Sequence, residues 1–154
     1  MENKGFQISR KNYPKIFLIS VTFEKNVTTE DFSKFICILD RFVNEKSPFA
    51  IYVDTRQCGA VPFQIGKMLG SWMKKRKPDI PGVLIASAIV LSSSVIVGLV
   101  NLAFKIQPPS SLNIVTRDEN RAQKFIDKII NPVPDIVDPN VVPNVDIVFE
   151  DVII

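Results

Sequence analysis

Runs of apolar residues divide the first 130 positions into alternating strands and helices. Residues 6–10 and 16–23 flank the turn-forming sequence Lys-Asn-Tyr-Pro and predict a β-hairpin. Buried strands are predicted at 49–54, 83–91 and 112–115. Between them, apolar residues recur at intervals of three and four, as at Phe32, Phe35, Ile36, Leu39 and Val43, which predicts amphipathic helices.

The predicted order of elements is ββαβαβαβα. Thr28 or Thr29 opens the first helix and Pro62 suits the first turn of the second. Thr116 and Glu119 form a capping-box pattern that predicts the start of the last helix. Strands that alternate with helices predict an α/β fold, with a mixed, largely parallel five-stranded sheet covered by helices.

The 23 residues from Gly82 to Phe104 carry no charge and are long enough to span a membrane. Ser92, Ser93 and Ser94 interrupt this run, and serine is a helix N-cap or turn residue. The interpretation that the sequence favours is a buried strand, a serine turn and a buried helix, so a membrane span is not expected.

Residues 131–154 differ in composition from residues 1–130 and form a separate C-terminal arm. The arm has four prolines in its first thirteen residues, which exclude a helix there. It holds five acidic residues and no Lys or Arg, which gives it a charge of −5 and leaves residues 1–130 at +8. We expect Val145–Ile154 to form an edge strand, and the arm to pack on a protein partner or on another copy of the chain.

The sequence contains no histidine and only two cysteines, Cys37 and Cys58. It therefore lacks the commonest general base and the commonest metal ligand, and no Ser-His or Cys-His triad can form. The two cysteines are expected to be reduced and mostly buried. No nucleotide-binding glycine motif is present, so the sequence predicts a protein that is not an enzyme and has no cofactor or metal.

Three groups of polar residues are candidates for a site. Asp54 and Arg56 follow a central strand, where open α/β sheets place ligands, although a lone carboxylate is more often the partner of an arginine. Ser92, Ser93 and Ser94 would bind an anion or, as the simpler reading, cap a helix. Lys74, Lys75, Arg76 and Lys77 form a basic patch that is either a solvated helix end, a phosphate or partner contact, or a nuclear address. Too few aromatic residues accompany this patch to predict sequence-specific nucleic-acid binding.

The strand that runs into Asp54, followed by a loop and a helix, resembles the STAS and anti-sigma-factor-antagonist-like domains. The matching segments are residues 49–69, 83–104 and 112–130. The resemblance implies a small regulatory module with a mixed sheet backed by helices. In the regulatory members a serine at the start of this helix is phosphorylated, whereas residues 59–66 read GAVPFQIG and offer no hydroxyl, so that switch is not expected here.

These observations favour a non-enzymatic protein-interaction or structural module, and a component of a larger assembly, viral assemblies included, fits the arm. The alternative is a small-ligand or lipid-binding domain, with the apolar segment 83–104 lining its pocket. The absence of an apolar leader predicts a cytoplasmic protein. Residues 74–77 leave a nuclear location open, and the assembly hypothesis leaves a virion open.

Overall fold

A computed structural model of the chain describes residues 5–131 and 147–150. Within these residues, six strands form one sheet and follow one another in chain order across it. The strands are β1 (Phe6–Asn12), β2 (Phe17–Phe23), β3 (Phe49–Asp54), β4 (Leu84–Val90), β5 (Leu112–Thr116) and β6 (Ile147–Glu150). β1 is antiparallel to β2, and every other neighbouring pair is parallel. The predicted mixed, largely parallel sheet is confirmed in β1–β5, and β6 extends it beyond β5.

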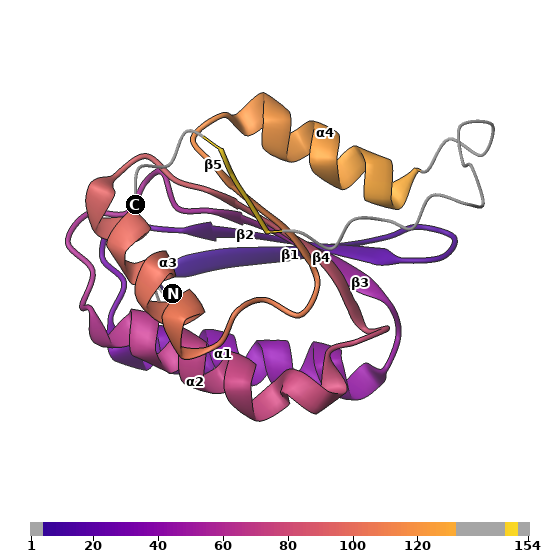
Figure 1. Ribbon diagram of the computed structural model, residues 1–154, viewed down its shortest axis with the longest axis horizontal. Coiled ribbons are helices and arrows are strands. Elements are labelled where there is room, and N and C mark those ends of the chain that lie inside the picture. The colour runs from indigo at the N-terminus through magenta and orange to yellow at the C-terminus, as the bar shows by residue number, and fades with distance from the viewer. Residues whose placement is uncertain (1–4, 132–146, 151–154) are drawn as a thin grey trace.

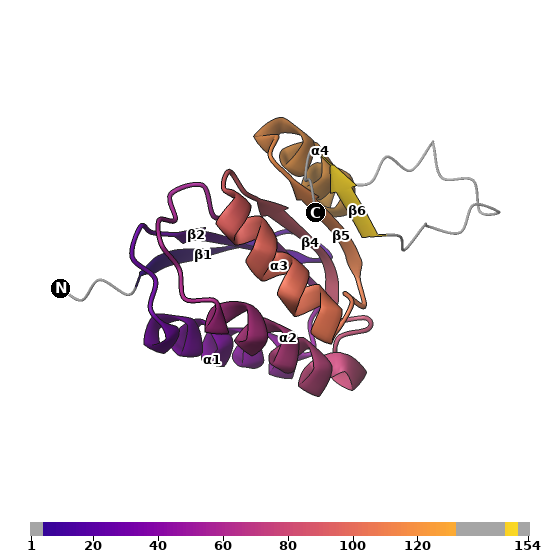
Figure 2. The same cartoon turned by 60° about the vertical axis from the view of Figure 1, so that its left-hand side comes forward.

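The helices lie on both faces of the sheet and form three layers with it (Figures 1 and 2). They are α1 (Thr29–Glu45), α2 (Gln64–Arg76), the short 3-10 helix η1 (Lys77–Asp79), α3 (Ser94–Ile106) and α4 (Glu119–Ile130). α1, α2 and α3 cover one face, and α4 covers the other. Strand residues that alternate along the sequence therefore enter two separate cores.

Local hydrogen bonds set where the helices begin. Thr28, one of the two threonines that the sequence predicted to open the first helix, is the N-cap of α1 and forms a reciprocal capping box with Asp31. The predicted capping box of Thr116 and Glu119 is wrong. Thr116 is the buried last residue of β5, and Asp118 caps α4 by accepting a hydrogen bond from the Asn120 N–H. Because Thr116 is held in the sheet as the last residue of β5, the helix begins two residues later, with Asp118 as its N-cap.

The uncharged run of residues 82–104 folds as strand, turn and helix, which confirms the interpretation from the sequence. β4 ends at Val90, Ser93 caps α3 by accepting from the Ile96 N–H, and α3 continues to Ile106. No helix in the part of the chain that the structure describes has the length and apolar character needed to cross a membrane.

α2 and α3 pack side by side through small residues. A Cβ atom built on Gly66 would lie 2.8 Å from the carbonyl oxygen of Leu99, so the two backbones approach as closely as glycine permits. Gly70, four residues after Gly66, meets Ala103, four residues after Leu99, so the two helices run in the same direction and begin at the same end of the molecule.

Candidate functional site

The carboxyl edge of the parallel strands carries a small ion cluster formed by Asp54, Arg56 and Glu119. Arg56 holds Asp54 with two side-chain hydrogen bonds, Nε to Oδ1 at 3.0 Å and Nη2 to Oδ2 at 2.8 Å. The Arg56 backbone N–H donates to Oδ1 as well, at 2.9 Å. Arg56 also contacts Glu119 at the first turn of α4, so it links the loop after β3 to the helix on the other face.

This cluster favours a structural role for Asp54. Hydrogen bonds from Arg56 hold the pKa of the Asp54 carboxyl below its ordinary value of 3.8, against the opposing effect of burial. A general base needs a pKa near the working pH, and a carboxylate held by a bidentate arginine is poorly placed to take a proton. The arrangement is the arginine partnership that the sequence favoured over catalysis.

The serine turn lies at the same edge of the sheet. The Ser92 hydroxyl donates to the Arg56 carbonyl at 3.3 Å, and Arg117 donates to the Ser92 carbonyl at 3.0 Å. Ser93 uses its hydroxyl to cap α3. The structure thus brings Asp54, Arg56 and Ser92 together and gives Ser93 the capping function, while anion binding by this turn stays a prediction.

Tyr52 is a member of this region that the sequence did not single out. It lies two residues before Asp54 on the α4 face of β3 and is 8% exposed. Burial, followed by the charges of Glu119 and Asp54, raises the pKa of the Tyr52 hydroxyl. Residues two apart in a strand lie on the same face of the sheet, so the sequence could have placed Tyr52 on the same face as Asp54.

The basic patch lies at the other end of α2, away from the ion cluster. Lys74, Lys75 and Lys77 are exposed. Arg76 instead faces α1, where it donates to Asn44 at 2.8 Å and pairs with Asp40 at 3.4 Å. Three of the four predicted contact residues are therefore available at the surface.

Two large apolar side chains are exposed at the start of the helix pair. Phe63, immediately before α2, is 55% exposed, and Val95, in the first turn of α3, is 53% exposed. Since the parallel helices begin at the same end, both side chains lie at the carboxyl edge of the sheet. Lys67, one turn into α2, places its ammonium 5.0 Å from the Phe63 ring.

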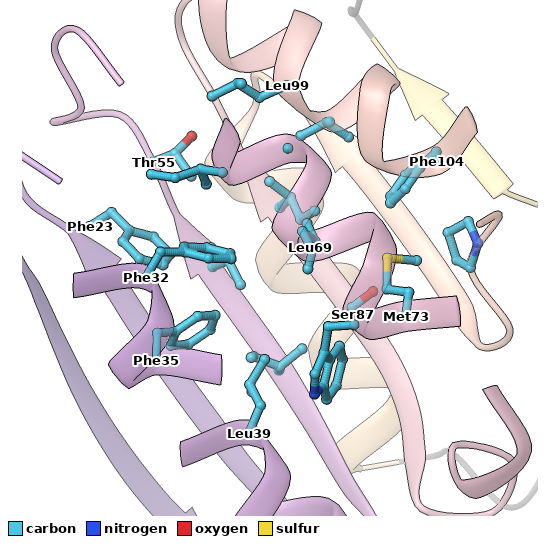
Figure 3. A pocket seen from close by; sticks show the side chains of 18 of the residues that line it. Phe23, Phe32, Phe35, Leu39, Thr55, Leu69, Met73, Ser87, Leu99 and Phe104 are labelled. Carbon is cyan, nitrogen blue, oxygen red and sulfur yellow. The ribbon is translucent and has the colours of Figure 1, made fainter. Parts of the chain in front are cut away.

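A cavity of about 160 Å³ lies between the sheet and helices α1, α2 and α3. Phe23, Phe32 and Phe35 gather on one side of it, and Met73 and Phe104 lie on the other (Figure 3). Its described lining is almost wholly apolar, and the uncharged polar side chains on it are those of Thr55, Cys58, Ser87, Ser110 and Ser111. Thr55 is satisfied within the sheet, because its hydroxyl donates to the Val90 carbonyl at 2.8 Å.

The alternative hypothesis from the sequence, a ligand-binding domain, placed residues 83–104 along a pocket, and Leu84, Ser87, Ile96 and Leu99 line this cavity. It missed the contributions of α1 and α2, because these come from segments far apart in the chain.

The two cysteines differ in their surroundings. Cys37 is exposed on α1, so the expectation that it is buried is wrong. Cys58 is half-buried in the cavity wall, and burial together with the charge of Asp54 raises its pKa to about 11. A thiol with a raised pKa is a poor nucleophile.

Among the described residues, no group of three or more Cys, Asp or Glu side chains is placed to hold a metal ion. The carboxylates at the sheet edge are paired with arginine. The described residues offer two apolar features, the cavity between the sheet and α1, α2 and α3, and the exposed edge at Phe63 and Val95.

No known protein family and no curated protein matches the sequence. Among solved structures, the chain is similar to an uncharacterized DUF3478-family protein with a SpoIIAA-like fold from Shewanella loihica. The TM-score is 0.56 at 11% identity, over 79% of this chain and 93% of that one. It is also similar to an anti-sigma factor antagonist from Mycobacterium paratuberculosis, with a TM-score of 0.46 at 12% identity, over 81% of this chain and 97% of that one.

The chain therefore has a SpoIIAA-like fold, which confirms the resemblance to STAS-like domains. At this level of identity the comparison shows the architecture alone. Function has to come from the residues of this chain.

Proposed function

We propose that this protein is a non-enzymatic protein-interaction module that binds its partner at the carboxyl edge of the sheet. The observation that carries the proposal is the exposure of Phe63 and Val95 at the adjoining starts of α2 and α3. Large apolar side chains that stay in water at one place on a surface are typical of interaction sites, and aromatic residues are favoured as anchors there.

The charges around these two residues favour an acidic partner. Lys67 lies beside Phe63, Lys25 is exposed next to the loop that precedes α2, and residues 1–130 carry a net charge of +8. Basic residues beside an apolar centre attract an acidic surface and speed its approach. Binding should accordingly weaken as salt concentration rises.

A double variant, Phe63→Ser with Val95→Ser, tests the proposal. Both side chains are exposed, so the fold should be retained. Proteins captured from the source organism's lysate by the wild-type chain should be lost with the double variant by about tenfold or more. Lys105→Ser, an exposed change at the far end of α3, serves as the matched control and should capture the same proteins as the wild type. An unchanged set of captured proteins with the double variant would contradict the proposal.

The cavity favours a second candidate function, the binding of a small apolar ligand. Apolar cavities of roughly 150 Å³ stay dry and take up small apolar molecules. The lining described above is almost wholly apolar, and a ligand that binds only the folded protein would stabilise it. The two functions do not compete for the same residues, because Phe63 and Val95 lie outside the cavity.

The C-terminal arm supports a further part of the proposal, an assembly of several chains, viral assemblies included. β6 pairs with β5 of the same chain over Ile147–Glu150. Most of the arm lies outside the described residues, so its contact with a partner is proposed from its charge and its apolar end. Light scattering of the full-length protein at low and high salt tests this part, and a monomer under both conditions would contradict it.

A further inference from the structure

We propose that this protein also binds double-stranded nucleic acid, through a basic surface at the amino ends of the parallel strands. This surface lies at the opposite edge of the sheet from Phe63 and Val95 and shares no residue with the protein-binding site proposed above. Three features of the surface support nucleic-acid binding: where the topology places exposed lysines, which charges neutralise them, and which side chains accompany them.

The topology collects lysines from separate segments at one edge of the sheet. Strands β2–β6 are parallel, so each helix that connects two of them ends at the edge where the next strand begins. The turn between β1 and β2 lies at the same edge, because Asn12 pairs with Phe17, the first residue of β2. In Figure 1 this turn and the ends of α2 and α4 lie toward the right of the view. Seven exposed lysines from the end of β1, this turn and the ends of α1, α2 and α4 form what we term the basic edge: Lys11, Lys15, Lys46, Lys74, Lys75, Lys77 and Lys128.

The lysines of the basic edge are not neutralised by neighbouring carboxylates. Glu45 pairs with Arg10 at 2.9 Å, and Asp79 pairs with Arg76 at 3.3 Å. Between described residues, every ion pair is made by an arginine and none by a lysine. The arginines thus take up the nearby acidic side chains, and the ammonium groups stay available to a partner.

Helix dipoles account for only a minor part of this charge. A helix C-terminus carries about half a negative charge, so the ends of α1, α2 and α4 together offset fewer than two of the seven lysine charges. Asp127 offsets one more. Acidic residues lie instead at the opposite edge, where α1 and α4 begin with Glu30, Asp31 and Glu119. Positive charge that is concentrated at one edge attracts a polyanion and orients the protein on it.

The side chains that accompany the lysines favour a duplex over other anionic partners. Phe63 and Val95, the two large apolar side chains that the described part of the chain exposes, both lie at the other edge. Single-stranded nucleic acid is bound by exposed aromatic rings that stack on the bases, and a membrane surface by apolar side chains that insert into it. Tight contact with another protein needs apolar or aromatic anchors. Lysines alone fit a duplex, whose phosphates are exposed and whose bases are stacked inside, and such binding does not depend on base sequence.

Fluorescence anisotropy tests the proposal, with full-length protein titrated into a labelled DNA duplex of about 20 base pairs. We expect saturable binding with a Kd of about 10 µM or tighter at about 50 mM salt, and the same affinity for two duplexes of unrelated sequence. The affinity should fall steeply with salt. The logarithm of the binding constant decreases by about 0.9 per phosphate contact for each tenfold rise in salt concentration.

Two double variants with the same change in net charge locate the contact. Lys74→Gln with Lys77→Gln removes two ammonium groups from the basic edge. It should weaken binding about tenfold and reduce the salt slope by about 1.8, the value for two phosphate contacts. Lys34→Gln with Lys124→Gln removes two exposed ammonium groups from the middle of α1 and α4 and is the matched control. It should leave the salt slope unchanged.

A third variant, Lys15→Gln with Lys128→Gln, changes two other segments of the basic edge. It should reproduce the weaker binding and the smaller salt slope, and it replaces the first variant should that one fail to fold. Equal weakening by the variants of the basic edge and by the control would show a general attraction of charge and overturn the assignment to this edge.

The choice of a duplex as partner has its own tests. Tighter binding of a single strand of the same sequence, or of vesicles with about one third anionic lipid, would overturn the duplex as the partner. The absence of saturable binding to the duplex would overturn the proposal as a whole. Phe63→Ser with Val95→Ser should bind the duplex as the wild type does, so a failure of duplex binding and a failure of the protein-binding site can be told apart.

Discussion

Gly70 of α2 lies so close to Ala103 of α3 that a Cβ atom on the glycine would stand 2.8 Å from the Ala103 carbonyl oxygen. The same atom would lie 2.7 Å from Cβ of Ile106. Contacts of this length are too short for real side chains, and one of the two obstacles is backbone. Together with Gly66, one helical turn earlier, Gly70 lets α2 and α3 pack in parallel over the cavity.

Replacing Gly70 by alanine should therefore destabilise the protein, although alanine is the better helix former. Overpacking of a tight contact costs about 1–3 kcal/mol, which exceeds the gain of about 1 kcal/mol in helix propensity. Gly98→Ala is the matched control in the neighbouring helix, because nothing lies within 4 Å of a Cβ there. We expect Gly98→Ala to raise the urea midpoint and Gly70→Ala to lower it. A stabilised Gly70→Ala variant would show that the helices are further apart than described.

The two cysteines should differ strongly in their reactivity. Cys37 is exposed, whereas Cys58 is half-buried and has its pKa raised to about 11 from an ordinary value of 9.0. That increase lowers the thiolate fraction of Cys58 about a hundredfold at neutral pH, before burial limits access further. An aromatic disulfide reagent at about pH 8 should modify one thiol rapidly and the second only after unfolding.

The variants Cys37→Ser and Cys58→Ser assign the two phases. Loss of the slow phase in the Cys37→Ser protein would contradict the assignment. If a small apolar molecule occupies the cavity, the reaction of Cys58 should slow further while that of Cys37 stays the same, because Cys58 lines the cavity and Cys37 does not.

The pairing of Asp54 with Arg56 should make stability depend on pH at the acid end. The pKa of Asp54 is lower in the folded protein than its ordinary value of 3.8, so the unfolded chain takes up the proton first as pH falls. The stabilisation is therefore complete above about pH 4 and is lost as pH drops through the folded-state pKa. Asp54→Asn should lower stability by about 1 kcal/mol near neutral pH and by little near pH 3, a modest effect because Arg56 is partly exposed.

Urea unfolding of the wild type and of Asp54→Asn at the two pH values measures this difference. Asp127→Asn, which removes an exposed carboxylate from α4, is the control and should have little effect at either pH. An equal loss at both pH values for Asp54→Asn would show that the carboxylate charge is not what stabilises the edge. The same variant should leave any catalytic activity found for this protein within about tenfold, since general acid–base groups contribute more than that.

The order of strands and helices follows from the sequence because each element carries its own periodicity. The strand before Asp54 and the helix that begins at Ser94 are examples, since local spacing and capping residues define them. Thr116 shows the limit of this reasoning. The spacing of Thr116 and Glu119 that predicts a capping box can be read from neighbouring residues. The pairing of Thr116 with Val90 of β4 joins distant parts of the chain, and this pairing keeps Thr116 in the strand.

The candidate site also has one part that the sequence could predict and one part that it could not. Asp54, Arg56 and Ser92 could be predicted to lie together because they follow neighbouring parallel strands. The cavity could not, because its walls meet only after α1 and α2 have packed on the sheet. Two glycines four residues apart, Gly66 and Gly70, indicate that another helix packs closely here. The sequence analysis predicted this helix from its apolar residues alone and did not use the glycines.

The C-terminal arm should stabilise the fold through its strand. In the structure β6 pairs with β5 in parallel over Ile147–Glu150, so β5 is not an edge strand. Removing residues 131–154 would expose the backbone groups of β5, and an unprotected edge strand is both less stable and prone to pair with other chains. We expect the shortened protein to melt at a lower temperature and to aggregate more readily. Raising salt should reduce the difference in melting, because the arm carries a charge of −5 and residues 1–130 carry +8, and salt screens the attraction between opposite charges. Limited proteolysis of the full-length protein measures the same contact directly. Cleavage near Asn131 that proceeds rapidly, with the melting temperature and the mass in solution both unchanged, would show that the arm contributes nothing to the fold.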